Sequence, residues 1–346
     1  MTTDSGGSCS HRVTLQFLDG ESQTITVAED ESLLTAAKAQ SVPILHQCES
    51  GSCGSCSVRL TSGELIMRSD VAASLLASEH AAGMRLACIS HPKSDCDVEL
   101  EYASDATSLK PGKAVVFLDD IEWIAQDVVK LSTELAEGDW LDFQPGQFVQ
   151  LQVPGTDAFR RYSMSSTPSQ IPKLEFLIRV LPDGVMSNYL RNDARVDDTL
   201  ALEGPFGSFF LRENAKRAPI LMIAGGTGLA PMMSMLDVIR ARSGLKPKIL
   251  VSFGCAAMDN LFYVDELDLR KDWMAGLETR ISVDKGRSER DIVIGNPLQA
   301  IAAGDISEDT VAYLCGPPPM IEASYAHLSQ LGVRAENIYA EQFIPS

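Results

Sequence analysis

The sequence has little positive charge to offset its acidic residues. Its 346 residues include 29 Lys and Arg against 47 Asp and Glu, for a formal net charge of −18 and a pI of about 4.7. Nucleic acid and anionic membranes attract basic proteins, so neither is expected as a partner. The acidic excess is densest in residues 1–105, with 15 acidic and 6 basic residues. Such a segment either docks on a basic surface or is simply well solvated.

A secretion signal and an uninterrupted apolar run are also missing. Met1–Gly20 shows no basic segment followed by an apolar one. Ala218 to Leu236 carries no charge, but Gly225–Gly228 and Pro231 interrupt it. This pattern predicts a strand, a loop and a helix rather than a membrane span. We therefore expect a cytoplasmic protein whose eight cysteines are metal ligands or reactive thiols rather than a disulfide framework.

The first domain is predicted to be a small mixed sheet crossed by one helix. Arg12–Leu18 and Gln23–Val27 alternate apolar and polar residues, as in a β-hairpin. A helix is expected over Asp30–Gln40, with Asp30 as its cap. Further strand segments are Val58–Leu60, Glu64–Met67 and Asp97–Tyr102. The aperiodic stretch Ala103–Gly112 is typical of a linker.

Two further domains are predicted beyond this linker, and the chain shows no internal repeat. Residues 110–213 contain short strands separated by Gly and Pro turns, which is typical of an antiparallel β-barrel. Residues 214–346 alternate strands and helices, which indicates a βαβ series on a parallel sheet. The predicted fold is therefore multidomain, α+β and α/β, with domains at 1–104, 110–213 and 214–346.

Four cysteines of the first domain have the spacing of an iron–sulfur ligand set. They are Cys48, Cys53, Cys56 and Cys88. The first three follow C-x4-C-x2-C, the plant-type [2Fe–2S] pattern, and Gly51 and Gly54 allow the loop to turn around a cluster. A zinc site is the alternative, but zinc ribbons usually contain two C-x2-C pairs and this sequence has one. We expect three other cysteines not to be ligands: Cys9, Cys96 and Cys255.

Several motifs in residues 110–346 occur together in one order. They are Arg160-Arg161-Tyr162-Ser163 after Pro145–Phe148, Gly184–Ser187 at a helix start, Gly225–Pro231, Cys315–Met320 and the tail Glu341-Gln342-Phe343. In these motifs the region resembles the ferredoxin–NADP reductase superfamily. The resemblance implies FAD in the barrel domain and a nicotinamide dinucleotide on the parallel sheet. With the first domain, it implies a β-grasp ferredoxin domain, an antiparallel FAD-binding barrel and an α/β NAD domain.

The resemblance also implies roles for single residues. Arg160 and Ser187 would contact the FAD diphosphate at a helix N-terminus. Tyr162 would lie against the isoalloxazine, and Cys315 beside the nicotinamide, although a buried packing thiol is the other reading of Cys315. The candidate catalytic residues are Ser163, Cys315 and Glu341. The candidate cofactor-binding residues are Arg160, Tyr162, Ser163, Val180, Gly184, Met186, Ser187, Gly225, Gly226, Thr227, Gly228, Pro231, Gly316, Pro317 and Phe343.

The segment after the second strand of the last domain bears on coenzyme choice. Gly254–Asp259 contains no Lys or Arg to bind a 2′-phosphate, which favours NADH over NADPH. Lys285 and Arg287 follow the third strand and leave NADPH as the alternative.

The expected function is electron transfer from NADH to a protein acceptor. NADH gives two electrons at once and a [2Fe–2S] cluster takes one, so a flavin must stand between them. The domain order resembles reductase components of multicomponent oxygenases, which implies a terminal oxygenase as partner. Leu174–Val196 resembles reductases of soluble di-iron monooxygenases, while Gly207–Glu213 and Tyr313–Ala323 equally resemble those of benzoate-type Rieske dioxygenases. A deoxysugar dehydratase reductase and a non-catalytic redox sensor are the alternatives. We expect a monomer.

Overall fold

The computed structural model describes residues 9–70, 74–213, 217–286 and 292–343. The chain forms two compact units. The first comprises Met1–Lys110 and Phe206–Ser208, and the second comprises Pro111–Pro205 and Phe209–Ser346. Within the described residues, no helix is both long and apolar enough to cross a membrane.

The first unit is built on a five-stranded mixed sheet in the order β2-β1-β7-β3-β5. Its strands are β1 (Ser10–Phe17), β2 (Ser22–Ala28), β3 (Ser57–Ser62), β5 (Met84–Leu86) and β7 (Cys96–Leu100). A small second sheet pairs β4 (Leu65–Met67) with β6 (Ser90–Pro92), and the helices are α1 (Leu33–Ala39) and α2 (Ala77–Ala81). Strand β1 pairs antiparallel with β2 and parallel with β7. This arrangement confirms the predicted mixed sheet crossed by one helix.

Helix α1 begins later than the sequence pattern predicted. Ser32 is the N-cap, and its Oγ accepts the backbone N–H of Thr35 at 3.2 Å. The prediction of Asp30 as cap was wrong, because residues 28–31 form a turn in which the N–H of Glu31 donates to the carbonyl of Ala28. The hydroxyl of Ser32, two residues further along, accepts a backbone N–H of the first helical turn instead.

The start of the predicted linker is folded onto the first unit. Ser104–Ser108 form a 3₁₀ turn, and Ala106 is buried. The carboxylate of Asp19, in the β1–β2 turn, accepts the N–H and the hydroxyl of Ser104 at 2.8 and 2.6 Å. These bonds lower the pKa of Asp19.

The second unit begins with a six-stranded antiparallel barrel in the order β11-β10-β13-β8-β9-β12. Its strands are β8 (Gly112–Ala125), β9 (Val128–Leu135), β10 (Phe148–Gln152), β11 (Phe159–Ser163), β12 (Lys173–Arg179) and β13 (Thr199–Phe206). The two edges meet where Met164 bridges Phe176 and where the N–H of Ser165 donates to the carbonyl of Glu175. The predicted antiparallel barrel is therefore confirmed, with helix α3 (Val185–Asn192) beside it.

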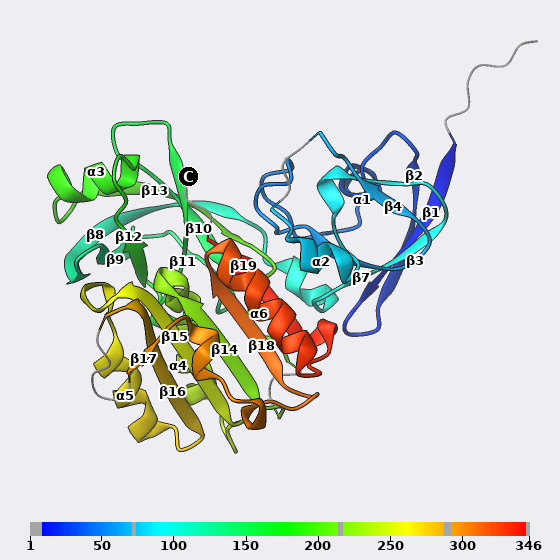
Figure 1. Ribbon diagram of the computed structural model, residues 1–346. Helices are drawn as coiled ribbons and strands as arrows, with labels where there is room; N and C mark the ends of the chain where they lie inside the picture. The colour runs from blue at the N-terminus through cyan, green and yellow to red at the C-terminus, as the bar shows by residue number, and fades with distance from the viewer. Residues whose placement is uncertain (1–8, 71–73, 214–216, 287–291, 344–346) are drawn as a thin grey trace, which may run out of the picture. The chain divides into compact units, whose positions relative to one another are not determined.

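The remainder of this unit is a six-stranded parallel sheet in the order β17-β16-β15-β14-β18-β19 (Figure 1). Its strands are β14 (Ile220–Gly225), β15 (Ile249–Ala257), β16 (Leu277–Lys285), β17 (Ile292–Ile294), β18 (Val311–Gly316) and β19 (Ile338–Gln342). Its helices are α4 (Leu229–Ala241), α5 (Val264–Trp273) and α6 (Pro318–Gln330). The strand order reverses between β14 and β18, and α/β sheets bind ligands at the carboxyl ends of the strands at such a switch point.

Candidate electron-transfer site

The cluster loop combines short sequence spacing with a backbone that is left-handed at three residues. Cys48, Cys53 and Cys56 lie between α1 and β3, and Cys88 lies in the 3₁₀ turn directly after β5. Glu49, Gly51 and Gly54 have positive φ angles of 55°, 83° and 73°. The two glycines adopt this left-handed conformation without the cost of a Cβ.

One ion pair, one histidine contact and one buried hydroxyl support this loop, and the motif predicted none of them. The carboxylate of Glu49 lies 2.7 Å from Nζ of Lys38 and 3.7 Å from Nε2 of His46. The N–H of Leu45 donates to the buried hydroxyl of Tyr102 at 3.0 Å. The loop is therefore fixed at its start from α1 and from the end of β7.

The four sulfur atoms form two hydrogen-bonded pairs, Cys48 with Cys53 and Cys56 with Cys88. The bond from Cys53 lowers the pKa of Cys48, and the backbone N–H groups of Ser50 and Ser52 donate to its sulfur at 3.4 and 3.3 Å. The bond from Cys56 likewise lowers the pKa of Cys88.

This pairing fits two metal ions better than one. Within the described part of the first unit, no three of the four sulfurs lie within 4.8 Å of one another. A tetrahedral zinc site with bonds of about 2.3 Å would bring all four within about 4 Å. A two-iron cluster takes two sulfurs on each iron, which is what two separate pairs provide. Cys96 is not with them, because it lies buried on β7 and packs against Gly63.

The barrel places the candidate flavin residues on β11, β12 and α3. Arg160 and Tyr162 share one face of β11, because alternate residues of a strand point the same way, and Tyr162 packs against the barrel core. Nη1 of Arg160 donates to the carbonyl of Phe159 at 2.9 Å. Val180 follows β12 directly and is buried.

Helix α3 begins where the motif predicted. Gly184 is its N-cap, so the first backbone N–H groups of α3 have no partners within the helix and suit a diphosphate. Met186 and Ser187 are both buried. The hydroxyl of Ser187 accepts the N–H of Leu181 at 2.9 Å. This contact leaves its own proton to donate to an anion.

The glycine loop after β14 packs closely against the segment around Cys315–Met320 on one side and faces open space on the other. A Cβ on Gly228 would lie 2.2 Å from the carbonyl oxygen of Cys315, and one on Gly225 would lie 2.7 Å from Sδ of Met320. Gly226 has φ +55°, and no atom lies within 4 Å of the place of a Cβ. This open side leaves room for a ligand close to the backbone of the loop. Thr227 is buried in the loop, and Pro231 lies in the first turn of α4, where proline is tolerated.

The second nicotinamide motif forms the end of β18 and the start of α6. Gly316 is the last residue of β18, and Pro317 is the N-cap of α6. The carbonyl of Gly316 accepts the N–H of Phe343 at 2.9 Å. The ring of Phe343 packs against the core of the parallel-sheet domain.

The three candidate catalytic residues meet between the barrel and the parallel sheet. The hydroxyl of Ser163 donates to Oε2 of Glu341 at 3.3 Å. Cys315 is the register partner of Glu341 between β18 and β19, and it is fully buried. Burial raises the pKa of Glu341 to about 8, against the bond from Ser163, and it also raises the pKa of Cys315.

Arg161 belongs to this group, although the sequence reading assigned it no role. It lies on the same face of β11 as Ser163, and its charge acts to lower the pKa of Glu341. The presence of a second basic residue within the R-x-Y-S motif could have indicated a role for Arg161.

The loop after β15 carries no basic side chain, in agreement with the sequence. Lys285 is the register partner of Ala257 and is exposed, while Arg287 lies outside the described residues. This loop is joined to the barrel, because Nδ2 of Asn260 donates to Oδ1 of Asp127 at 2.8 Å. Cys255 is buried in β15, far along the chain from the four paired cysteines.

Three family models match the chain in the expected order. A 2Fe-2S iron-sulfur cluster binding domain matches residues 16–93. An oxidoreductase FAD-binding domain matches residues 115–211, and an oxidoreductase NAD-binding domain matches residues 222–325. The fold class and the cofactors [2Fe–2S], FAD and NAD are thereby confirmed.

Curated relatives match this chain over almost their whole length. The chain is 34% identical over 342 residues to the 2-halobenzoate 1,2-dioxygenase electron transfer component of Burkholderia cepacia, covering 97% of this chain and 98% of the relative. It is 32% identical over 352 residues to the propane 2-monooxygenase reductase component of Mycolicibacterium smegmatis, covering 96% and 97%. The chain belongs to the family of reductase components of multicomponent oxygenases. Among solved structures, the Amycolatopsis cytochrome P450 reductase GcoB is similar, with a TM-score of 0.70, 26% identity and coverage of 96% and 99%.

Proposed function

We propose that this reductase takes electrons from NADH and delivers them singly to a terminal oxygenase. The observation that carries the proposal is the contact of Ser163 with Glu341, beside Cys315 at the switch point of the parallel sheet. That contact joins the FAD-binding barrel to the NAD-binding sheet, and in this proposal the nicotinamide meets the flavin beside it. A redox sensor would not need this half of the chain, and relatives that serve oxygenases over their full length favour an oxygenase over a deoxysugar dehydratase.

FAD, when bound, accepts a pair of electrons from the donor and can pass them on one at a time. The side chains around the FAD site bind and orient the cofactor, and one of them holds a proton. Arg160 and the N-terminus of α3 bind the diphosphate, and Tyr162 supports the ring. Glu341 keeps its proton at neutral pH, because its pKa is about 8, and Ser163 connects it to the flavin side. Cys315 would lie beside a bound nicotinamide as a neutral thiol, because burial raises its pKa.

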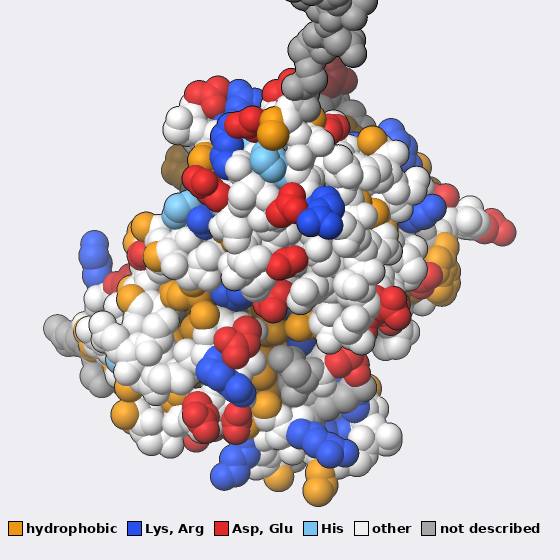
Figure 2. All heavy atoms as spheres, turned by 90° about the vertical axis from the view of Figure 1, so that its right-hand side faces the viewer, with side chains coloured by type: hydrophobic (Ala, Val, Ile, Leu, Met, Phe, Trp, Pro, Cys, Tyr) orange, Lys and Arg blue, Asp and Glu red, His pale blue; other side chains and the backbone are white. Residues whose placement is uncertain are grey.

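The four paired cysteines hold the cluster that relays single electrons. Cys48, Cys53, Cys56 and Cys88 are the proposed ligands, and the exposed part of their loop gives a partner protein access. The first 105 residues carry a net charge of −9, from 15 acidic and 6 basic residues. Figure 2 shows acidic and basic side chains interspersed on the face that it draws, so on that face the excess is not gathered into one patch.

The partner proposed is a terminal oxygenase of the dioxygenase or the monooxygenase class. The relatives include both, at 34% and 32% identity. We further propose a cytoplasmic monomer, since thiol ligands suit a reducing compartment. The net charge of −18 supports the proposal that neither nucleic acid nor membrane is a partner.

An anaerobic titration tests the proposal. NADH added to the purified holoprotein should bleach the flavin absorbance and produce the EPR signal of a reduced [2Fe–2S] cluster, and an oxygenase of the matching class should reoxidise both. NADPH and NADH should be compared at equal concentration. Bleaching of the flavin without any cluster signal would contradict the proposed electron path.

A further inference from the structure

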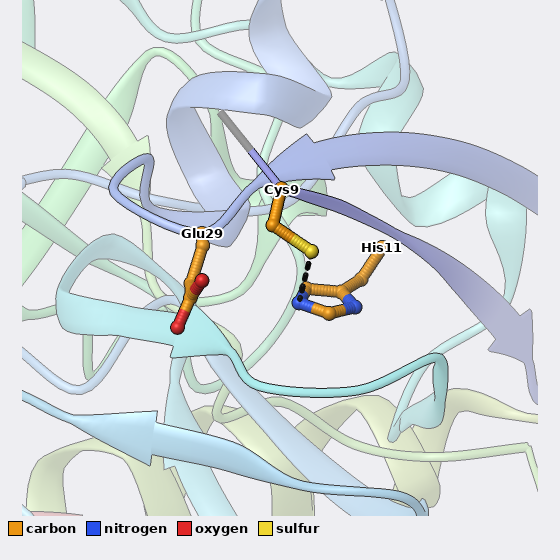
Figure 3. A group of neighbouring side chains, drawn as sticks. All are labelled: Cys9, His11 and Glu29. Carbon is orange, nitrogen blue, oxygen red and sulfur yellow. Dashed lines mark hydrogen bonds between the residues drawn. The ribbon is translucent and has the colours of Figure 1, made fainter. Parts of the chain in front are cut away.

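The first unit contains a second group of metal-ligating side chains, apart from the four cluster cysteines. Cys9, His11 and Glu29 each offer one ligand atom, and these atoms lie within 4.8 Å of one another. Sγ of Cys9 and Nε2 of His11 are 4.0 Å apart. Figure 3 shows the thiol directed at the imidazole, with the carboxylate of Glu29 beside them.

The pairing of β1 with β2 places these residues together. His11 is the register partner of Val27, and two residues further along the ladder the N–H of Glu29 donates to the carbonyl of Cys9 at 2.9 Å. Alternate residues of a strand share a face, so Cys9 and His11 continue the inward face of Val13. The group therefore lies at the rim of the core, where the backbone ladder limits its movement.

The ligand types indicate a borderline transition metal. A thiolate, an imidazole and a carboxylate are all ligands of Zn²⁺, and three protein ligands with one water complete its tetrahedron. In such a site the ligand atoms lie about 3.5 Å apart, given metal bonds of about 2.0–2.3 Å. Small side-chain rotations would bring the present separations of up to 4.8 Å to that value.

One side chain opposes metal binding at this place. Nζ of Lys93 lies 2.6 Å from Oε1 of Glu29, so a metal ion must displace this ammonium group from the carboxylate. Both side chains are about two-fifths exposed, which lets Lys93 turn into solvent. The ion pair also shows that the carboxylate of Glu29 already holds a cationic group at this place.

We propose that Cys9, His11 and Glu29 form a surface Zn²⁺ site at the open end of the β1–β2 hairpin, separate from the [2Fe–2S] loop. The metal binds to the thiolate of Cys9, whose proton is released, and to Nε2 of His11 and one carboxylate oxygen of Glu29. The rotation of Lys93 away from Glu29 accompanies binding.

Equilibrium dialysis of the tag-free holoprotein against buffered micromolar Zn²⁺, with zinc measured by mass spectrometry, tests the proposal. One zinc per chain is expected, and the visible absorbance of the cluster should stay constant, which shows that the cluster ligands are not the zinc ligands. Cys9→Ser and His11→Gln should each weaken binding by at least about tenfold, since each removes one of three ligands. His80→Gln, on the exposed surface of α2, is the matched control and should change nothing.

Two charge variants test the carboxylate ligand. Glu29→Gln should weaken binding about as much as the loss of His11, and Lys93→Ala should strengthen it, because the competing ammonium is gone. The proposal is overturned if zinc does not bind at about ten micromolar, or if Cys9→Ser and His11→Gln bind it as the unaltered protein does. The proposal is also overturned if zinc binding lowers the visible absorbance of the cluster.

Discussion

Replacing Glu341 with Gln should remove a pH dependence from the stability of the reductase. The carboxyl of Glu341 has a pKa of about 8 in the folded protein and a reference value of 4.5, because burial disfavours its charged form. Between these two pH values the folded state holds a proton that the unfolded state has released. Stability contributed by this group is therefore greatest below pH 4.5 and falls as the pH rises towards 8.

The size of the effect follows from the same two values. Each pKa unit corresponds to about 1.36 kcal/mol, so a rise from about pH 5.5 to about pH 7.5 removes at most about 2.5 kcal/mol from the free energy of unfolding. For a unit of this size, about 1 kcal/mol shifts Tm by about 2–4 °C, which predicts a difference of at most about 10 °C. A Gln side chain has no proton to lose and should show no such difference.

Thermal unfolding of the holoprotein, followed by flavin fluorescence at both pH values, is the assay. The fall in Tm from pH 5.5 to 7.5 should be several degrees smaller in Glu341→Gln than in the unaltered protein. Glu308→Gln is the control, because Glu308 is an exposed carboxylate in the same domain. Equal pH slopes for all three proteins would refute the assignment of a protonated Glu341 in the folded protein.

Three further predictions concern the cofactors. Cys88→Ser should remove the EPR signal of the reduced cluster and lower the iron content, whereas Cys96→Ser should leave both unchanged. Arg160→Ala should weaken FAD binding by roughly ten- to a hundredfold, measured by fluorescence on dilution, because it removes a charge-assisted hydrogen bond worth about 1.5–3 kcal/mol. For NADH, kcat/KM should exceed that for NADPH by at least about tenfold in steady-state assays. Equal values would instead implicate Lys285 or Arg287 as a phosphate ligand.

The features that the sequence predicted well are those encoded in neighbouring residues. The cysteine spacing, the helix start at Gly184 and the glycine loop after β14 are local patterns, and each lies where its pattern placed it. The uncharged stretch from Ala218 is a strand, a loop and a buried helix, as Pro231 and the glycines indicated. The spacing of apolar residues was sufficient to predict this strand and helix, because the buried residues of each recur at a regular period.

Other features depend on contacts between segments that are far apart in sequence. Strand β19 is short and partly polar, and only its pairing with β18 makes it a strand. The N-cap of α1 is Ser32 rather than the predicted Asp30. Both residue types make good caps, and the turn at residues 28–31 sets which of them precedes the helix. The bond between Asn260 and Asp127 joins two loops that carry no motif, so no sequence pattern could have predicted it.

The central claim is that electrons reach the oxygenase through the cluster. The most direct test compares the full chain with the double variant Cys56→Ala/Cys88→Ala, which removes one of the two sulfur pairs. Both proteins should oxidise NADH with ferricyanide at similar rates, because hydride transfer uses only the second unit. Stopped-flow reduction of a terminal oxygenase should proceed with the full chain and nearly cease with the variant. Undiminished reduction of the oxygenase by the variant would show that the flavin delivers electrons directly, and it would contradict the account.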